Sequence, residues 1–416
     1  MFFKLSILIL VCVLIFSVLR KKIDTLLFVF SCLWTVVIFL YDLRLFDIFA
    51  VGNNTQLVVF GGVMGFIIGH VAADKLQFTI KGNRSIICDR VDTRVNYVFV
   101  NIVFTVVLII AACYYIPNLI IGIKGGSAKV VKGLLMSGEL STGNVFVQYI
   151  ARPFSKIMIA TSAYCIINDR RQKYTIASGI VMALFELLGM WSKASLIFFA
   201  LCLVLSFFLN VDVMKQLSSN RKLLICVMVG VAAFFVFFVG FKGLYFYACG
   251  CIPMLDKIIN GTFYMPSGHT YGFLSFNSFF RLIIKLLEPF GIKSVIYDKA
   301  EDYYFRFDTT TRISPDKYYN AFHTMFGDFY IDFGLLGVVL LSALLGFVCA
   351  KIRINYKQTH NIQSYILLCI LAYYVLFSVV RFQMSNTVWG LALLYSFTIL
   401  KPILYQKFTV GRRKLY

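Results

Sequence analysis

Three side chains that could move a proton lie close together in the last third of the chain. His323 is followed by Asp328 and Asp332. A histidine changes protonation near neutral pH, so His323 could act as a general base toward a hydroxyl group. The two aspartates are spaced i, i+4 and would share one face of a helix, where either could orient His323 or bind the hydroxyl-bearing molecule. Capping of a first helical turn by acidic residues would explain the same pair, and both interpretations stay open.

Six cations form a second group of candidates, because each is expected at a helix end or in a long polar segment on one side of a membrane. They are Arg152, Lys193, Arg281, Arg306, Arg312 and Arg381. Arginine binds phosphate through bidentate, charge-assisted hydrogen bonds, and a charge near a membrane usually faces a cavity or a partner. Aromatic residues are interleaved with these cations, a combination that fits a phospholipid-linked glycan. A solvated loop with an aromatic belt, or snorkelling cations, would explain the same residues.

The chain that must position these residues is strongly apolar. Of its 416 residues, 60% are hydrophobic and 14% charged, whereas soluble proteins average about 45–50% and about 25%. The net charge of +21 would suggest nucleic acid on a soluble chain, but here the basic residues lie between apolar runs. We therefore expect an all-α polytopic membrane protein with no nucleic-acid partner.

A span needs about 20 apolar residues, so the sequence predicts about eleven transmembrane helices, within a range of about 10–12. The expected spans are 2–19, 25–41, 56–73, 97–116, 144–167, 175–191, 194–211, 223–243, 328–350, 363–380 and 386–400. We treat residues 1–416 as one integral membrane domain.

The connections between these spans alternate in charge, which predicts their sidedness. Basic residues concentrate in every second connection and mark the cytoplasmic side. The N-terminus is then expected outside and the C-terminus in the cytoplasm. The same assignment places a long hydrophilic segment, 244–327, on the outer face between the eighth and ninth helices.

Metal ligands are sparse. The chain has four histidines and eleven cysteines, most of the cysteines lie inside apolar runs, and no CxxC or HxxxH spacing occurs. We expect no metal and no cofactor.

Two segments flanking the long hydrophilic stretch are similar to a known enzyme family. YACGCIPMLD (247–256) enters this stretch and DFYIDFGLLGVVLLSALLGF (328–347) leaves it. Together with the order of the spans, they resemble the Wzy-type oligosaccharide repeat-unit polymerases of O-antigen and capsule biosynthesis. The resemblance implies a GT-C-like fold in the bacterial inner membrane and a metal-independent glycosyltransferase.

The resemblance also implies a substrate and roles for the candidate residues. A growing glycan on undecaprenyl pyrophosphate would be transferred to a hydroxyl of a new lipid-linked repeat unit. His323 would be the base or position the acceptor, Asp328 would orient it, and Asp332 and the six cations would bind glycan and pyrophosphate. Membrane lipid, a chain-length regulator and a flippase would be the partners.

Three other functions stay open on this sequence. The related O-antigen ligases carry a pattern that His323, Gly334 and Gly337 match in spacing, with Thr324 departing from it. A ligase would transfer finished glycan to lipid A core. PSGHT (266–270) resembles the central motif of type-2 phosphatidic-acid phosphatases, whose two other motifs are missing here. A repeat-unit flippase would have more spans and no outer loop of this length.

Overall fold

The computed structural model describes residues 1–19, 25–81, 95–124, 134, 145–190, 192–209, 241–261, 268–291, 293–306, 310–320 and 323–404. It is mostly helical, as expected. Within the described ranges, five helices are long and apolar enough to cross a membrane: Asn53–Leu76, Tyr97–Lys124, Lys173–Met190, Thr324–Thr359 and Ile362–Val379. Four shorter apolar helices are Phe2–Ile15, Leu26–Asp42, Ala194–Leu209 and Thr387–Phe397. The count of eleven spans stays a prediction, and most of the expected span 223–243 lies outside the described residues.

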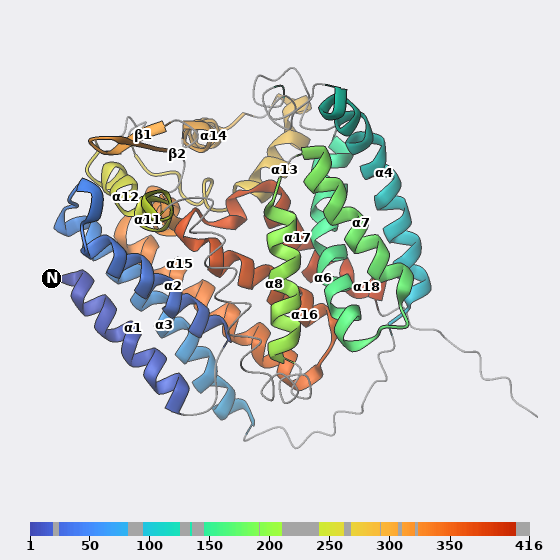
Figure 1. Ribbon diagram of the computed structural model, residues 1–416, viewed down its shortest axis with the longest axis horizontal. Coiled ribbons are helices and arrows are strands. Elements are labelled where there is room, and N and C mark those ends of the chain that lie inside the picture. The colour runs from blue at the N-terminus through green and yellow to red at the C-terminus, as the bar shows by residue number, and fades with distance from the viewer. Residues whose placement is uncertain are drawn as a thin grey trace, which may run out of the picture. The chain divides into compact units, whose positions relative to one another are not determined.

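The chain divides into two compact units. The first comprises Met1–Asn83, Phe208–Thr359 and Leu371–Gly390, and the second Arg84–Phe207, His360–Ile370 and Leu391–Tyr416. The long helices of the first unit are α1 (Phe2–Leu19), α2 (Thr25–Asp42), α3 (Asn53–Lys81) and α15 (Thr324–Thr359). They lie side by side in Figure 1. Short 3₁₀ turns, η1 (Leu45–Asp47), η4 (Phe377–Val379) and η5 (Gln383–Ser385), connect or follow helices of this unit.

Helices α3 and α15 run in the same direction and pack with their backbones close together. A Cβ atom added at Gly65 or Gly69 would come within 2.5 Å or 1.8 Å of a carbonyl oxygen of α15, and one at Gly346 within 2.1 Å of the Phe66 carbonyl oxygen. Small residues spaced four apart permit this close approach between membrane helices. The spacing of Gly61, Gly65 and Gly69 therefore determines which face of α3 meets α15.

Helix α15 is broken near its N-terminal end. Phe333 has φ −144° and Gly334 has φ +65°. A side chain would strain the positive φ at position 334, so glycine permits the break there. Residues 324–332 thus form a short segment that precedes the long apolar one.

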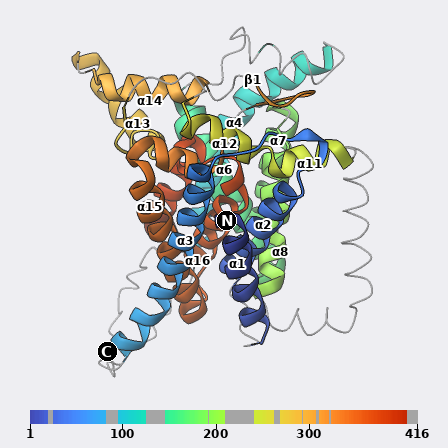
Figure 2. The same cartoon turned by 90° about the vertical axis from the view of Figure 1, so that its left-hand side faces the viewer.

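The long hydrophilic segment folds against this short part of α15. Residues 241–320, here called the loop region, contain α11 (Phe241–Cys249), α12 (Cys251–Ile259), α13 (Asn277–Leu287), η3 (Glu288–Phe290), α14 (Val295–Arg306), β1 (Thr310–Ser314) and β2 (Lys317–Asn320). Figure 2 shows α12, α13, α14 and β1 gathered at one end of α3 and α15.

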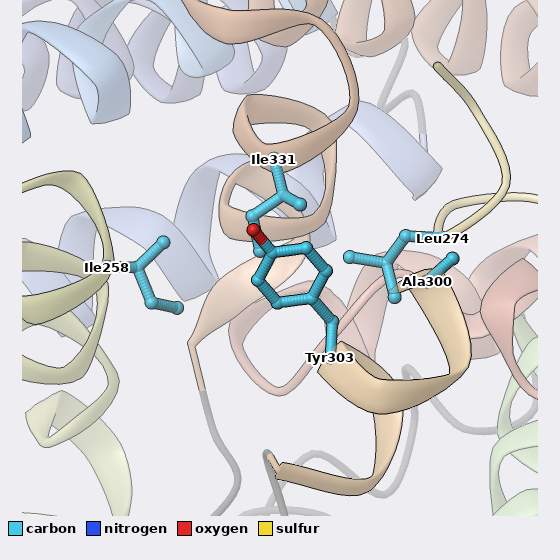
Figure 3. Packing of buried hydrophobic residues seen from close by; sticks show 5 residues of the cluster. All are labelled: Ile258, Leu274, Ala300, Tyr303 and Ile331. Atoms are coloured by element: carbon cyan, nitrogen blue, oxygen red, sulfur yellow. The ribbon is translucent and has the colours of Figure 1, made fainter. Parts of the chain in front are cut away.

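A small apolar core joins the loop region to α15. Ile258, Leu274, Ala300, Tyr303 and Ile331 are buried together, with Phe273 and Tyr304 packed against them. Figure 3 shows the Tyr303 ring lying among the other four side chains. The loop region thus packs against the short N-terminal segment of α15, residues 324–332.

The hairpin is the one departure from an all-helical chain among the described residues. Strands β1 and β2 pair antiparallel, with Thr310 opposite Asn320 and a bulge between Arg312 and Ser314. Pro315 and Asp316 form the turn, and proline favours such a position because its φ is already fixed. β-branched residues in β1 favour the extended backbone.

The second unit contains α4 (Tyr97–Lys124), the π-helical turn η2 (Val147–Ala151), α6 (Arg152–Asn168), α7 (Lys173–Met190), α8 (Ala194–Leu209) and α18 (Leu400–Leu404). Helices α16 (Ile362–Leu376) and α17 (Thr387–Phe397) contribute residues to both units. Gly179 of α7 lies against α6, where an added Cβ would be 2.4 Å from the Ser162 Cβ. Glycine again allows two helices to approach closely.

Candidate functional site

His323 and Asp328, the residues expected to act as base and orienting carboxylate, are in direct contact. His323 Nε2 lies 2.9 Å from Asp328 Oδ1. Because an ionised carboxylate can only accept, Nε2 carries the hydrogen. Both side chains are buried, His323 at 0% and Asp328 at 1% exposure. His323 therefore reaches no solvent in this conformation.

The pair connects the N-terminal part of α15 to residues 380–382. Asp328 Oδ2 accepts the backbone N–H of Phe382 at 2.6 Å. The backbone N–H groups of His323 and Thr324 both donate to the Val380 carbonyl, at 3.1 and 3.2 Å. Asp328 is thus used for a tertiary contact and does not cap its own helix.

Arg381 lies between the two residues that this contact holds, Val380 and Phe382. Its guanidinium carbon stands 4.5 Å from the centre of the Tyr304 ring, at the end of α14. Its Nη2 is buried and makes no hydrogen bond with the described residues. A guanidinium that is stacked on a ring and keeps an unused donor is suited to bind an anion.

Asp332 is held by the loop region. Its Oδ1 accepts the Thr270 hydroxyl and the N–H groups of Gly272 and Leu274, at 2.8 and 3.2 Å, while Oδ2 accepts the Ser275 N–H at 2.8 Å. Four donors from one turn occupy this carboxylate. The expected contact of Asp332 with a glycan stays a prediction, and the geometry favours a role in fixing residues 270–275 to α15.

His269 is an accessible histidine beside the break in α15. Its Nδ1 lies 3.1 Å from the Ile331 carbonyl oxygen, and since a carbonyl only accepts, Nδ1 carries the hydrogen. In the neutral ring, Nε2 is then left as an acceptor. A Cβ at Gly334 would stand 3.5 Å from His269 Cε1, and the residue is exposed.

In the sequence, His269 stands out only as part of the PSGHT motif, whose first two residues lie outside the described part of the chain. No sequence signal linked His269 to the break in α15, because the contact with Ile331 joins residues 62 positions apart.

The cations of the loop region are engaged by their own neighbours. Arg281 Nη2 lies 3.6 Å from Glu301 Oε2, and Arg306 Nε lies 2.8 Å from Asp302 Oδ2. Arg312 Nε donates to the carbonyls of Ser314 and Pro315 at 3.3 and 2.9 Å. Of the four candidate cations in the first unit, Arg381 is thus the one whose guanidinium has an orphaned buried donor.

Lys257 of α12 and Arg312 of β1 lie close enough for their charges to interact. Burial lowers the pKa of Lys257, and the charge of Arg312 lowers that pKa further. Both effects disfavour the charged form of Lys257.

The two remaining candidates, Arg152 and Lys193, belong to the second unit and flank a buried ionic cluster. Lys156 Nζ donates to Glu186 Oε2 and, at 2.8 Å, to the Ser195 hydroxyl. Ser155 and Ser195 donate to Glu186. Lys156 and Glu186 are 4% and 5% exposed, whereas Lys193 is exposed. Lys156 is thus paired inside the protein.

The cysteines of the loop region are buried thiols. Cys249 and Cys251 are free, and burial raises the pKa of Cys249 to about 12 and that of Cys251 above its ordinary value. Both stay protonated near neutral pH. Among the described residues no group of three or more His, Cys, Asp or Glu side chains could hold a metal ion.

Comparison with known proteins gives no relative: no protein-family model, no curated protein and no solved structure matches this chain.

Proposed function

We propose that the chain is an integral-membrane glycosyltransferase that polymerises lipid-linked oligosaccharide repeat units. It would use undecaprenyl-pyrophosphate-linked glycan in the bacterial inner membrane, through about eleven spans in a GT-C-like arrangement. Its N-terminus and loop region would face outward and its C-terminus the cytoplasm. The observation that carries this proposal is the contact of Asp328 with His323 and Phe382, since it holds Arg381 beside the loop region.

The chemistry needs few protein groups. A hydroxyl oxygen of the new repeat unit attacks the anomeric carbon of the growing glycan, forming a C–O bond as the bond from that carbon to the pyrophosphate oxygen breaks. The pyrophosphate leaves as an anion, so no acid is required. A base accepts the hydroxyl proton, and cations stabilise the leaving group.

Arg381 is the best-supported pyrophosphate ligand, because its Nη2 is an unused donor and its guanidinium is stacked on Tyr304. His323 as the base stays a prediction. Its burial and its bond to Asp328 favour a positioning role, in which the pair holds Arg381 in place. His269 offers an exposed Nε2 acceptor and is the stronger candidate for contact with the acceptor hydroxyl.

A ligase that transfers glycan to lipid A core is the second candidate function. The spacing of His323, Gly334 and Gly337 favours it. Gly334 permits the break in α15, and a Cβ at Gly337 would come within 2.4 Å of the Phe333 Cβ. Gly334 and Gly337 therefore serve the break in α15.

A gel of surface polysaccharide from the source bacterium, with the gene deleted and then restored, tests the proposal. We expect deletion to remove the ladder and leave one repeat unit attached to core. Core without any repeat unit, with lipid-linked polymer accumulating, would show a ligase. An unchanged ladder would overturn both and direct attention to a lipid phosphatase.

A further inference from the structure

The fully buried residues of helix α13 are polar, whereas part of its apolar side is exposed. Asn277 and Ser278 are buried, whereas Ile283 is 48% and Leu286 64% exposed. In a helix of a soluble protein, the apolar stripe faces the core and the polar face meets water. The orientation of α13 is the reverse.

Specific contacts fix this orientation. Asn277 Nδ2 donates to Glu301 Oε1 at 2.8 Å, and Arg281 pairs with the same carboxylate group. Ser278 lies against Gly390, where an added Cβ would be 1.9 Å from the Ser278 hydroxyl oxygen. The polar side of α13 is thus committed to α14 and to the first turn of α17, and the helix cannot turn its apolar side inward without losing these contacts.

The exposed apolar surface continues beyond α13. Phe290 in η3 is 78% exposed, and Val295 and Ile296 at the start of α14 are 84% and 39% exposed. Large apolar side chains adjacent in the chain and open on one side mark a surface that another apolar phase covers.

The position of α13 indicates which apolar phase covers this surface. Gly390, against which α13 begins, lies in the first turn of α17, one of the shorter apolar helices. A segment that starts beside the end of such a helix lies at the boundary between lipid and water. The charged residues near the end of α13 are consistent with this position. Lys285 Nζ pairs with Glu288 Oε2 at 2.8 Å on the exposed side, and Lys293 is exposed. Long cationic side chains at this depth reach the phosphate groups while their stems stay in the apolar layer.

We propose that α13, η3 and the start of α14 form a monotopic interfacial segment that inserts Ile283, Leu286, Phe290 and Val295 into the membrane leaflet on the side of the loop region. The segment follows the membrane surface, as amphipathic helices with one apolar face do. It would hold the loop region at a fixed depth, whichever reaction the protein catalyses.

The test uses the full-length protein in phosphatidylcholine and phosphatidylglycerol vesicles, with and without brominated acyl chains, which quench tryptophan on contact. The reporter is Phe290→Trp and the control is Tyr318→Trp, in β2 of the same region and 63% exposed. The signal of the three native tryptophans is subtracted with the unchanged protein. We expect brominated lipid to remove most of the added fluorescence of Phe290→Trp and little of that of Tyr318→Trp.

Equal and weak quenching at both positions overturns the proposal, and a blue-shifted Phe290→Trp emission would then indicate cover by a second copy or another protein. Val295→Trp is the second reporter, used if Phe290→Trp does not fold. Weak quenching of Val295→Trp overturns the proposal in the same way, and strong quenching supports it.

Discussion

His323 and Asp328 form a hydrogen-bonded pair that is closed to solvent, with His323 Nε2 2.9 Å from Asp328 Oδ1. The other oxygen of Asp328 accepts the Phe382 N–H. Both carboxylate oxygens are therefore acceptors facing donors.

Asp328→Asn tests this pair. One oxygen becomes an NH₂ group that faces either Nε2–H or the Phe382 N–H, so a buried donor loses its acceptor at a cost of about 1–3 kcal/mol. We expect a lower melting temperature in detergent and less polymer. Asp298→Asn, an exposed aspartate of α14, is the control and should leave both unchanged. An Asp328→Asn protein with normal stability would contradict the role of the pair.

The substitution His269→Asn distinguishes an effect on polymer synthesis from an effect on the stability of the protein. Removing the exposed Nε2 should abolish polymer, while the free energy of unfolding changes by less than about 0.5 kcal/mol, as for most surface substitutions. The control is His360→Asn, an exposed histidine with φ +49°, a conformation that asparagine tolerates. Normal polymer from His269→Asn would remove His269 from the reaction and return attention to His323.

Arg381 and Tyr304 are expected to act through the cation–π contact between them. Tyr304→Phe keeps the ring and should keep polymer synthesis, whereas Tyr304→Leu should lower it by roughly 2- to 30-fold, the equivalent of about 0.5–2 kcal/mol for a cation–π contact. Arg381→Lys should fall between wild type and Arg381→Ala in a polymer assay normalised to protein level. Equal loss in both Arg381 variants would show that the bidentate fork, and not the charge, is needed.

Asp332→Asn should loosen residues 270–275. An amide presents only one acceptor atom to four donors, and we expect a loss of at least about 1.5 kcal/mol, the lower bound for a hydrogen bond to a charged group. Limited proteolysis should cut this segment faster than in the unchanged protein. The matched control is Asp302→Asn, whose exposed pair with Arg306 contributes less than about 1 kcal/mol. Equal protease resistance of the two variants would contradict the role of Asp332 in holding residues 270–275.

The buried pair in the second unit should show strong non-additivity. Lys156→Met leaves the Glu186 carboxylate without its cation and should cost about 3–5 kcal/mol. Adding Glu186→Gln removes the remaining charge, and its amide oxygen still accepts from a serine. The double variant should therefore be more stable than Lys156→Met alone, as measured by thermal unfolding in detergent. A double variant with the summed loss of two single variants would show that the two charges do not interact.

The sequence by itself indicated the long apolar helices, but not α12, α13 and α14, which fold within the segment expected as an outer loop. The run 25–41 becomes α2 (Thr25–Asp42) and the run 97–116 becomes part of α4 (Tyr97–Lys124), because a continuous apolar stretch in a membrane must satisfy its backbone within a helix. The sequence does not predict the short hairpin, since four or five residues between aromatic segments carry little periodic signal. The tertiary structure adds that Gly61, Gly65 and Gly69 form the face of α3 that packs against α15.

Only the tertiary structure decided what each candidate side chain meets. Spacing placed Asp328 and Asp332 on one face, yet one turned to His323 and Phe382 and the other to a turn about 60 residues earlier. The amphipathic pattern of α13 was present in the sequence, but the pairing of Asn277 and Arg281 with Glu301 determined that its apolar side points outward. Helix periodicity is set by residues that are neighbours in the chain. These contacts depend instead on how segments far apart in the sequence pack together, which the local sequence does not specify.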